Sequence, residues 1–141
     1  MDTPIQDFDD LLRAARAQAQ PQQLLFVFVR AGLPEDPTPQ QRADFEAGIG
    51  GEIEPLMRVG MAPEALENFE ALVAEAAEFT EAADAAWALV FVSSLSGDAG
   101  RAPETADVES ALDDMVERIR GGWFRGMLPF DREGRTVELG A

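Results

Sequence analysis

The 141-residue sequence contains no histidine, cysteine, tyrosine or lysine, and its eleven basic residues are all arginines. These absences exclude the usual general base near neutral pH, the thiolate nucleophile and the Schiff-base amine. They also exclude a zinc site built from His or Cys and the lysine of a phosphate-binding loop. Because only Ser, Thr, Asp, Glu and Arg are left for catalysis, we expect a non-catalytic protein without a cofactor rather than an enzyme.

Long apolar runs are missing as well, since none approaches the roughly 20 residues of a membrane-spanning helix. The opening stretch "MDTPIQDFDD" is acidic and polar, unlike a secretory signal. The absence of cysteine excludes a disulfide framework. Because 46% of the residues are hydrophobic, we expect one folded cytoplasmic domain over residues 1–141 that does not bind membranes.

Positive charge is absent from the middle of the chain, where no arginine lies between Arg58 and Arg101, and the formal net charge is -16. Without a basic stripe to neutralise phosphates, we expect no direct binding to nucleic acid. An acidic surface favours instead a basic protein partner, which relieves the repulsion and is steered toward it. The candidate partner-binding residues are Glu64, Glu67, Glu70, Glu75, Glu78 and Glu81.

These glutamates recur mostly at intervals of three, so that on one helix opened by Pro63 neighbouring carboxylates would face each other. Each like-charge pair then costs about 0.2–0.5 kcal/mol, and no lysine relieves it. An acidic surface that regulates a partner, including one that mimics nucleic acid, is one interpretation. The alternative is a solvated helix face that serves only solubility.

Hydrophobic periodicity predicts four helices. The first begins at Pro4, capped by Thr3 and Gln6, and the second is a short helix capped by Thr38 and Gln41. The third opens at Pro63 and fades within residues 80–86. The fourth carries an apolar stripe and ends at two glycines; its stripe is Val108, Ala111, Leu112, Met115, Val116 and Ile119.

The strands are predicted between these helices. Residues 24–31 form a continuous apolar run, typical of a strand covered on both faces. Residues 53–61 include Pro55, which favours an edge position, and residues 87–94 are the clearest central strand. The C-terminal "DREG" favours a β-hairpin turn. The alternation predicts a single α/β domain with a mixed, partly parallel sheet of about five strands, helices packed on it and a C-terminal β-hairpin.

A Gly- and Ser-rich loop follows the third predicted strand. In open α/β sheets ligands gather at the carboxyl ends of strands, where glycines let backbone N–H groups approach an anion and arginine binds it bidentately. The candidate anion-binding residues are Ser93, Ser94, Ser96, Gly97, Gly100 and Arg101. This loop is the alternative function, a small-molecule anion or phosphate site or a Mg²⁺-dependent enzyme, although a plain turn selects the same residue types.

Two further alternatives have weaker support. The acids of "DFDD" and the Asp113–Asp114 pair are oxygen ligands of the kind Mg²⁺ prefers, but helix starts and helical ion pairs also account for them. A homodimer built on an exposed sheet edge, such as residues 136–139, is the other alternative.

Four stretches, "FDDLLRAAR…QQLLFVF", "GEIEPLMRVGM", "VFVSSLSGDAGRAP" and "MLPFDREG", carry a resemblance that covers nearly the whole chain. The sequence resembles a family of small, uncharacterised bacterial proteins often labelled "ribonucleotide reductase subunit alpha". Reductase chemistry of that kind works through cysteine thiyl radicals and redox cysteines. Because this chain has no cysteine, the resemblance implies membership of the family but not that activity.

Overall fold

The protein is described here from a computed structural model, which covers residues 5–32, 36–46, 52–79 and 87–137. One sheet has the strand order β2-β1-β3-β4, and every neighbouring pair is antiparallel. The strands are β1 (Gln22–Gly32), β2 (Glu52–Met61), β3 (Leu89–Ser96) and β4 (Leu128–Phe130).

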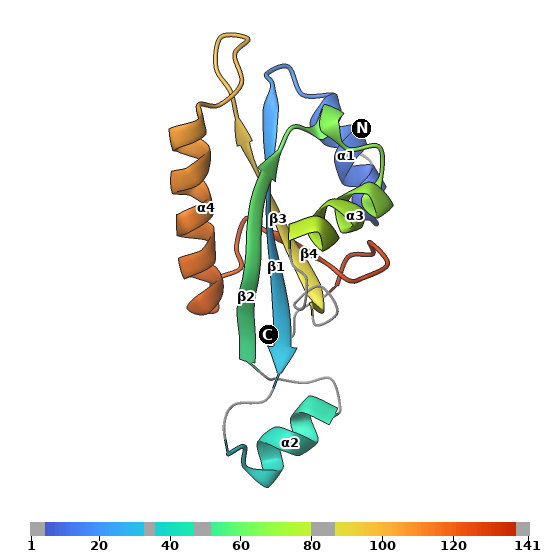
Figure 1. The fold of residues 1–141 in the computed structure, drawn as a ribbon, viewed down its shortest axis with the longest axis vertical. Helices are drawn as coiled ribbons and strands as arrows, with labels where there is room; N and C mark the ends of the chain where they lie inside the picture. Colours follow the sequence, from blue (N-terminus) through green and yellow to red (C-terminus); the bar gives the residue numbers. More distant parts are fainter. Residues whose placement is uncertain (1–4, 33–35, 47–51, 80–86, 138–141) are drawn as a thin grey trace.

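Helices cover both faces of this sheet (Figure 1). On one face lie α1 (Phe8–Arg16), the short 3-10 turn η1 (Pro63–Ala65) and α3 (Phe69–Phe79). On the other face lies α4 (Thr105–Arg120). Helix α2 (Pro39–Glu46) stands beyond the end of the sheet, in the connection between β1 and β2 (Figure 1). The predicted α/β fold with helices on the sheet is therefore confirmed.

The predicted parallel pairing was wrong, and the described residues form four strands, close to the expected number of about five. Strands β2 and β3 are each antiparallel to β1 and so run in the same direction, with β1 between them. The alternation of helices and strands agrees with the common direction of β2 and β3. It could not show that β1 lies between them. The turn of the C-terminal hairpin forms, whereas its second arm contributes only two isolated bridges within residues 5–137, from Thr136 to Phe130 and from Arg135 to Asp7.

Strand β1 is buried on both faces, as its continuous apolar run predicted. Alternate side chains point to opposite sides of the sheet, and residues 24–29 are each at most 3% exposed. Leu24, Phe26 and Phe28 join the cluster beneath α1 and α3, and the residues between them join the cluster beneath α4. The strand therefore anchors two separate cores.

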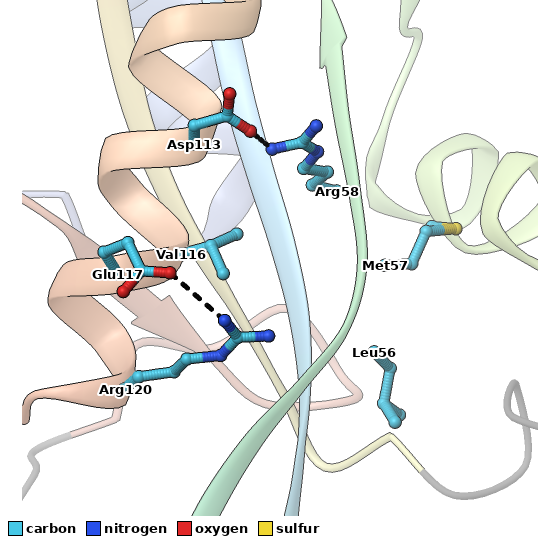
Figure 2. Close-up of a pocket in the computed structure, with 7 residues that line it drawn as sticks. All are labelled: Leu56, Met57, Arg58, Asp113, Val116, Glu117 and Arg120. Carbon is cyan, nitrogen blue, oxygen red and sulfur yellow. Dashed lines mark hydrogen bonds and ion pairs between the residues drawn. The ribbon is translucent and has the colours of Figure 1, made fainter.

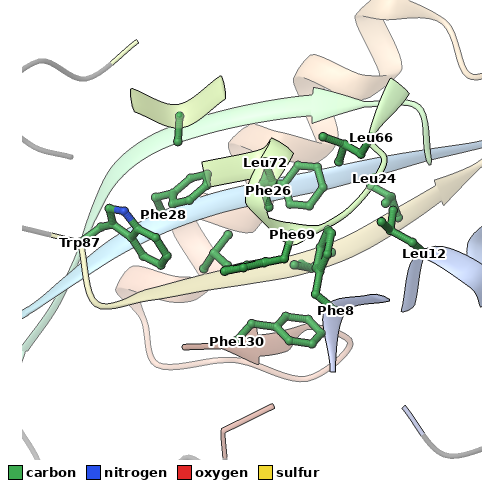
Figure 3. Close-up of a cluster of buried hydrophobic side chains, with 13 residues drawn as sticks. Phe8, Leu12, Leu24, Phe26, Phe28, Leu66, Phe69, Leu72, Trp87 and Phe130 are labelled. Atoms are coloured by element: carbon green, nitrogen blue, oxygen red, sulfur yellow. The ribbon is translucent and has the colours of Figure 1, made fainter. Parts of the chain in front are cut away.

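The core beneath α1 and α3 is aromatic (Figure 3). Phe8 on α1 lies within ring-centroid distances of 5.9, 5.4 and 5.6 Å of Phe26, Phe69 and Phe130. The tilted and edge-on geometries are those that aromatic pairs prefer. One residue of α1 thereby ties together β1, β4 and α3.

The first helix begins four residues later than predicted. Asp7 is its N-cap, and the Asp7 carboxylate accepts a hydrogen bond of 2.9 Å from the backbone N–H of Asp10. The expected cap Thr3 and Pro4 lie outside the described residues. In contrast, the cap of α2 is confirmed, because Thr38 and Gln41 exchange reciprocal side-chain to backbone hydrogen bonds of 3.0 and 2.8 Å.

The predicted long helix from Pro63 is broken. Pro63–Ala65 forms the 3-10 turn η1, and α3 begins only at Phe69. The Asn68 side chain accepts a hydrogen bond of 2.9 Å from the backbone N–H of Ala71, so Asn68 provides the helix start. The segment predicted to fade, residues 80–86, lies outside the described residues.

Pro55 lies on an edge strand, as predicted, because β2 ends the sheet. The pairing with β1 shifts register between Phe28 and Val29, so Leu56 is the extra residue between the paired Pro55 and Met57. Proline and a bulge together are common at sheet edges, where they discourage further pairing.

Candidate functional site

The Gly- and Ser-rich segment is a strand extension closed by a tight turn. β3 continues to Ser96, two residues beyond the predicted end. Asp98 and Arg101 exchange two backbone hydrogen bonds of 3.0 Å, and the residues between them, Ala99 and Gly100, have φ of 53° and 76°. Two consecutive positive φ values are typical of a type I′ hairpin turn, so the loop has the conformation of a structural turn.

The backbone donors expected to bind an anion already have protein acceptors. The N–H of Gly97 donates to the Pro21 carbonyl at 2.7 Å, and the N–H of Gly100 donates to the Gln20 side chain at 2.8 Å. Those of Asp98 and Arg101 close the turn itself. An anion nest requires several free N–H groups that converge on one point, and this geometry does not favour one.

The serines of this segment do not converge either. The Ser93 hydroxyl donates to the Gly126 carbonyl at 3.2 Å, Ser94 is exposed on the strand, and Ser96 accepts a hydrogen bond of 3.0 Å from the Gln22 amide. The hydroxyl groups of Ser93 and Ser96 are therefore engaged by neighbouring parts of the protein.

The hollow beside this turn, of about 900 Å³, is acidic. Arg101 lines it together with the carboxylates of Asp98, Glu104, Asp107 and Asp114. Such a lining repels an anion more than one arginine attracts it. Within the described residues no group of three or more carboxylates is arranged to hold a metal ion.

Arg101 does not meet the charged residues of the C-terminal turn. Asp131 accepts backbone hydrogen bonds of 2.9 and 3.0 Å from Glu133 and Arg135, which order the turn. Arg132 stacks 5.0 Å over the ring of Trp87, just before β3 begins. Arg101 follows the other end of that strand, so these residues do not form one pocket.

The predicted acidic residues divide among three local structures. Glu64 lies in η1 and Glu67 in the bend that follows, whereas Glu70 and Glu75 lie on α3. All four are exposed. Glu78 lies on α3, but its side chain and the whole of Glu81 lie outside the described residues. The prediction that these glutamates share one continuous helix is therefore wrong for Glu64 and Glu67, because residues 66–68 are not helical.

None of the four exposed glutamates has an arginine partner within the described parts of the chain. The ion pairs there involve other acids: Asp10, Glu54, Glu109, Asp113, Asp114 and Glu117. Arg16 reaches this segment, but its guanidinium donates to the carbonyl oxygens of Pro63 and Leu66. We call Glu64, Glu67, Glu70 and Glu75 the η1–α3 acidic surface.

A groove that the sequence analysis did not anticipate runs between β2 and α4. Its middle is crossed by Arg58 of β2, which pairs with Asp113 of α4 (Figure 2). The same guanidinium lies 3.7 Å from Glu109 of α4. The sequence did hold a signal, because an arginine within an apolar strand requires a polar neighbour. The matching acids recur at every fourth residue of the last helix.

The comparisons with known proteins give no relatives: no family model, curated protein or solved structure matches the chain. The resemblance to the small bacterial proteins therefore stays a prediction. Among the described residues, no helix combines the length and the apolar character that crossing a membrane requires.

Proposed function

We propose that this protein is a non-catalytic, acidic interaction module that binds a basic protein partner and acts as a regulatory or accessory factor. The observation that carries the proposal is the η1–α3 acidic surface, where four exposed carboxylates lack an arginine partner among the described residues. A partner with arginine or lysine side chains relieves the repulsion among these carboxylates and is drawn to them over long range.

The break between η1 and α3 makes this surface broader than a single helix face. The Asn68 cap fixes the start of α3, and Arg16 holds η1 through the carbonyls of Pro63 and Leu66. Carboxylates on a fixed scaffold lose less conformational freedom on binding. The arrangement therefore supports recognition of a folded basic surface.

The test is capture of partners from the native host on the tagged full chain, at low and at high salt. We expect a stoichiometric basic protein that is retained at low salt and lost at high salt, because exposed charges are screened over about 10 Å at 0.1 M ionic strength. Changing Glu64, Glu67, Glu70 and Glu75 together to Gln should release it. DNA added as competitor tests whether the surface mimics nucleic acid.

A matched control uses the same number of substitutions on another acidic surface, the hollow beside Arg101, with Asp98, Glu104, Asp107 and Asp114 changed to the corresponding amides. These residues are also exposed. Equal loss of the partner in both variants would show that total charge, rather than the η1–α3 acidic surface, governs binding. A partner retained by both variants would contradict the proposal.

A further inference from the structure

The outer edge of β2 has no strand beside it in the described part of the sheet, since β2 is terminal in the strand order. In Figure 1 this strand lies between α4 on one side and α1 and α3 on the other. Pro55 and the register shift interrupt its first half, but residues 57–61 pair with β1 one to one. Because proline and bulges are the devices that blunt an edge, residues 57–61 form the part that can still accept another strand.

Two hollows lie end to end along this edge and share Arg58. The first, of about 410 Å³, is lined by Leu56 and Val116 among others (Figure 2). The second, of about 460 Å³, includes Gly60 and Leu112. Together they form one groove, with β2 as one wall and α4 as the other. We call it the β2–α4 groove.

The spacing of the acids on the α4 wall matches an extended chain. Glu109, Asp113 and Glu117 line the groove at intervals of four residues, which corresponds to about 6 Å along a helix. Alternate residues of a strand point the same way and lie about 6.8 Å apart. A strand laid along β2 with basic side chains at every second position therefore brings each near one carboxylate of α4.

Arg58 shows that a guanidinium presented from a strand reaches this row, because it pairs with Asp113 and approaches Glu109. Despite these contacts the side chains of Glu109 and Asp113 remain 59% and 64% exposed. Glu117, paired with Arg120, is 71% exposed. Each carboxylate can therefore accept a second cation.

We propose that the β2–α4 groove binds an extended segment of the partner, rich in arginine or lysine at alternate positions, by strand addition to residues 57–61. Strand addition supplies backbone hydrogen bonds, and the facing wall supplies specificity. This inference rests on the proposed function, which makes the partner basic. A second copy of the chain is a poorer occupant, because both copies carry a formal net charge of -16 and repel each other.

The experiment measures binding of a short capped peptide that alternates arginine and valine to the full chain, by calorimetry and by amide shifts in NMR spectra. We expect shifts at residues 57–61. Changing Glu109 and Glu117 to Gln should raise Kd about five- to tenfold, from two lost exposed charge contacts. The matched control, Asp9→Asn with Glu133→Gln, changes two exposed acids outside both proposed binding surfaces. It should change Kd less than about twofold, since it alters only distant charge.

Backbone pairing is tested separately from charge. Methylating the peptide nitrogens that face β2 should abolish binding, whereas methylating the alternate nitrogens should leave it intact. Equal binding of both methylated peptides, or of a peptide with the arginines grouped at one end, would overturn strand addition. A dimer detected by light scattering and broken by the peptide would overturn the choice of occupant.

These outcomes separate the two proposals. If Glu70→Gln with Glu75→Gln on α3 weakens binding of the peptide and the α4 variant does not, the groove is wrong while the acidic interaction module stands. If no basic peptide binds and no basic partner is captured, both are wrong. Thermal unfolding of each variant, at the protein concentration used for the binding measurement, verifies that the substituted chains remain folded.

Discussion

The two helical layers differ in how their surface acids are neutralised. On α4 the carboxylates of Asp113, Asp114 and Glu117 pair with Arg58, Arg118 and Arg120. On the opposite face, the four glutamates of the η1–α3 acidic surface have no arginine partner within the described residues. The positions of a few arginines, rather than the total charge, therefore decide which carboxylates already have an arginine partner within the protein.

The two cores beneath these layers differ as well, and substitutions there give the largest expected effects. Phe8 is fully buried and contacts three other rings, whereas Leu112 on α4 belongs to a core that is mostly aliphatic and holds one stacked aromatic pair, Phe91 and Phe124. Phe8→Ala should lower the free energy of unfolding by about 3–5 kcal/mol, and Leu112→Ala by about 2–3 kcal/mol. Urea denaturation measures both, and an equal or larger loss for Leu112→Ala would contradict the aromatic core as the dominant one.

Close packing on the aromatic side is tested at Gly134, which has φ of 81° and whose added Cβ would meet the Phe69 ring at 2.9 Å. Gly134→Ala should cost about 2–4 kcal/mol, from overpacking together with backbone strain. The matched control is Gly122→Ala after α4, where φ is 79° and nothing lies within 4 Å. It should cost only about 1–2 kcal/mol, and equal losses would show that contact with Phe69 contributes nothing.

The contrast between the two acidic surfaces predicts smaller changes in the free energy of unfolding, with one sign on α4 and the other on α3. Asp113→Asn removes the partner of Arg58 and should lower the free energy of unfolding by about 0.2–1 kcal/mol. Glu75→Gln removes a charge that has no arginine partner among the described residues, in the second half of α3, and should be neutral or stabilising by about 0.3 kcal/mol. Thermal unfolding at low and high salt measures both changes, and the difference should shrink at high salt. Equal destabilisation by the two variants would remove the contrast between the faces.

Local chemistry made much of the fold predictable. The apolar run of β1, the Thr38–Gln41 cap and the edge position of Pro55 each depend on residues close together in sequence, and each is confirmed. The break before α3 was missed because Pro63 and Asn68 both provide helix starts, and local pattern does not decide between them. Strand order was not predicted, because it depends on which surfaces pack together.

The candidate sites were less predictable for the same reason. Glycines at residues 97 and 100 are equally compatible with an anion nest and with a type I′ turn, and only the hydrogen-bond partners distinguish the two. The β2–α4 groove joins residues some 50 positions apart, and Arg58 alone hinted at it. Patterns within one element were informative, whereas sites shared between elements required the fold.

The smallest expected effect concerns the turn at Arg101. We expect added phosphate to leave the unfolding temperature of the wild-type chain and of Arg101→Ala unchanged relative to chloride at equal ionic strength. The reason is that the N–H groups of Gly97 and Gly100 already donate to protein acceptors, and four carboxylates line the same hollow as Arg101. An anion bound at a hundred times its Kd would stabilise the chain by about 2.7 kcal/mol, which such a measurement detects readily. A shift in the wild type that Arg101→Ala abolishes would therefore restore the anion site as the function, against the geometry of the turn.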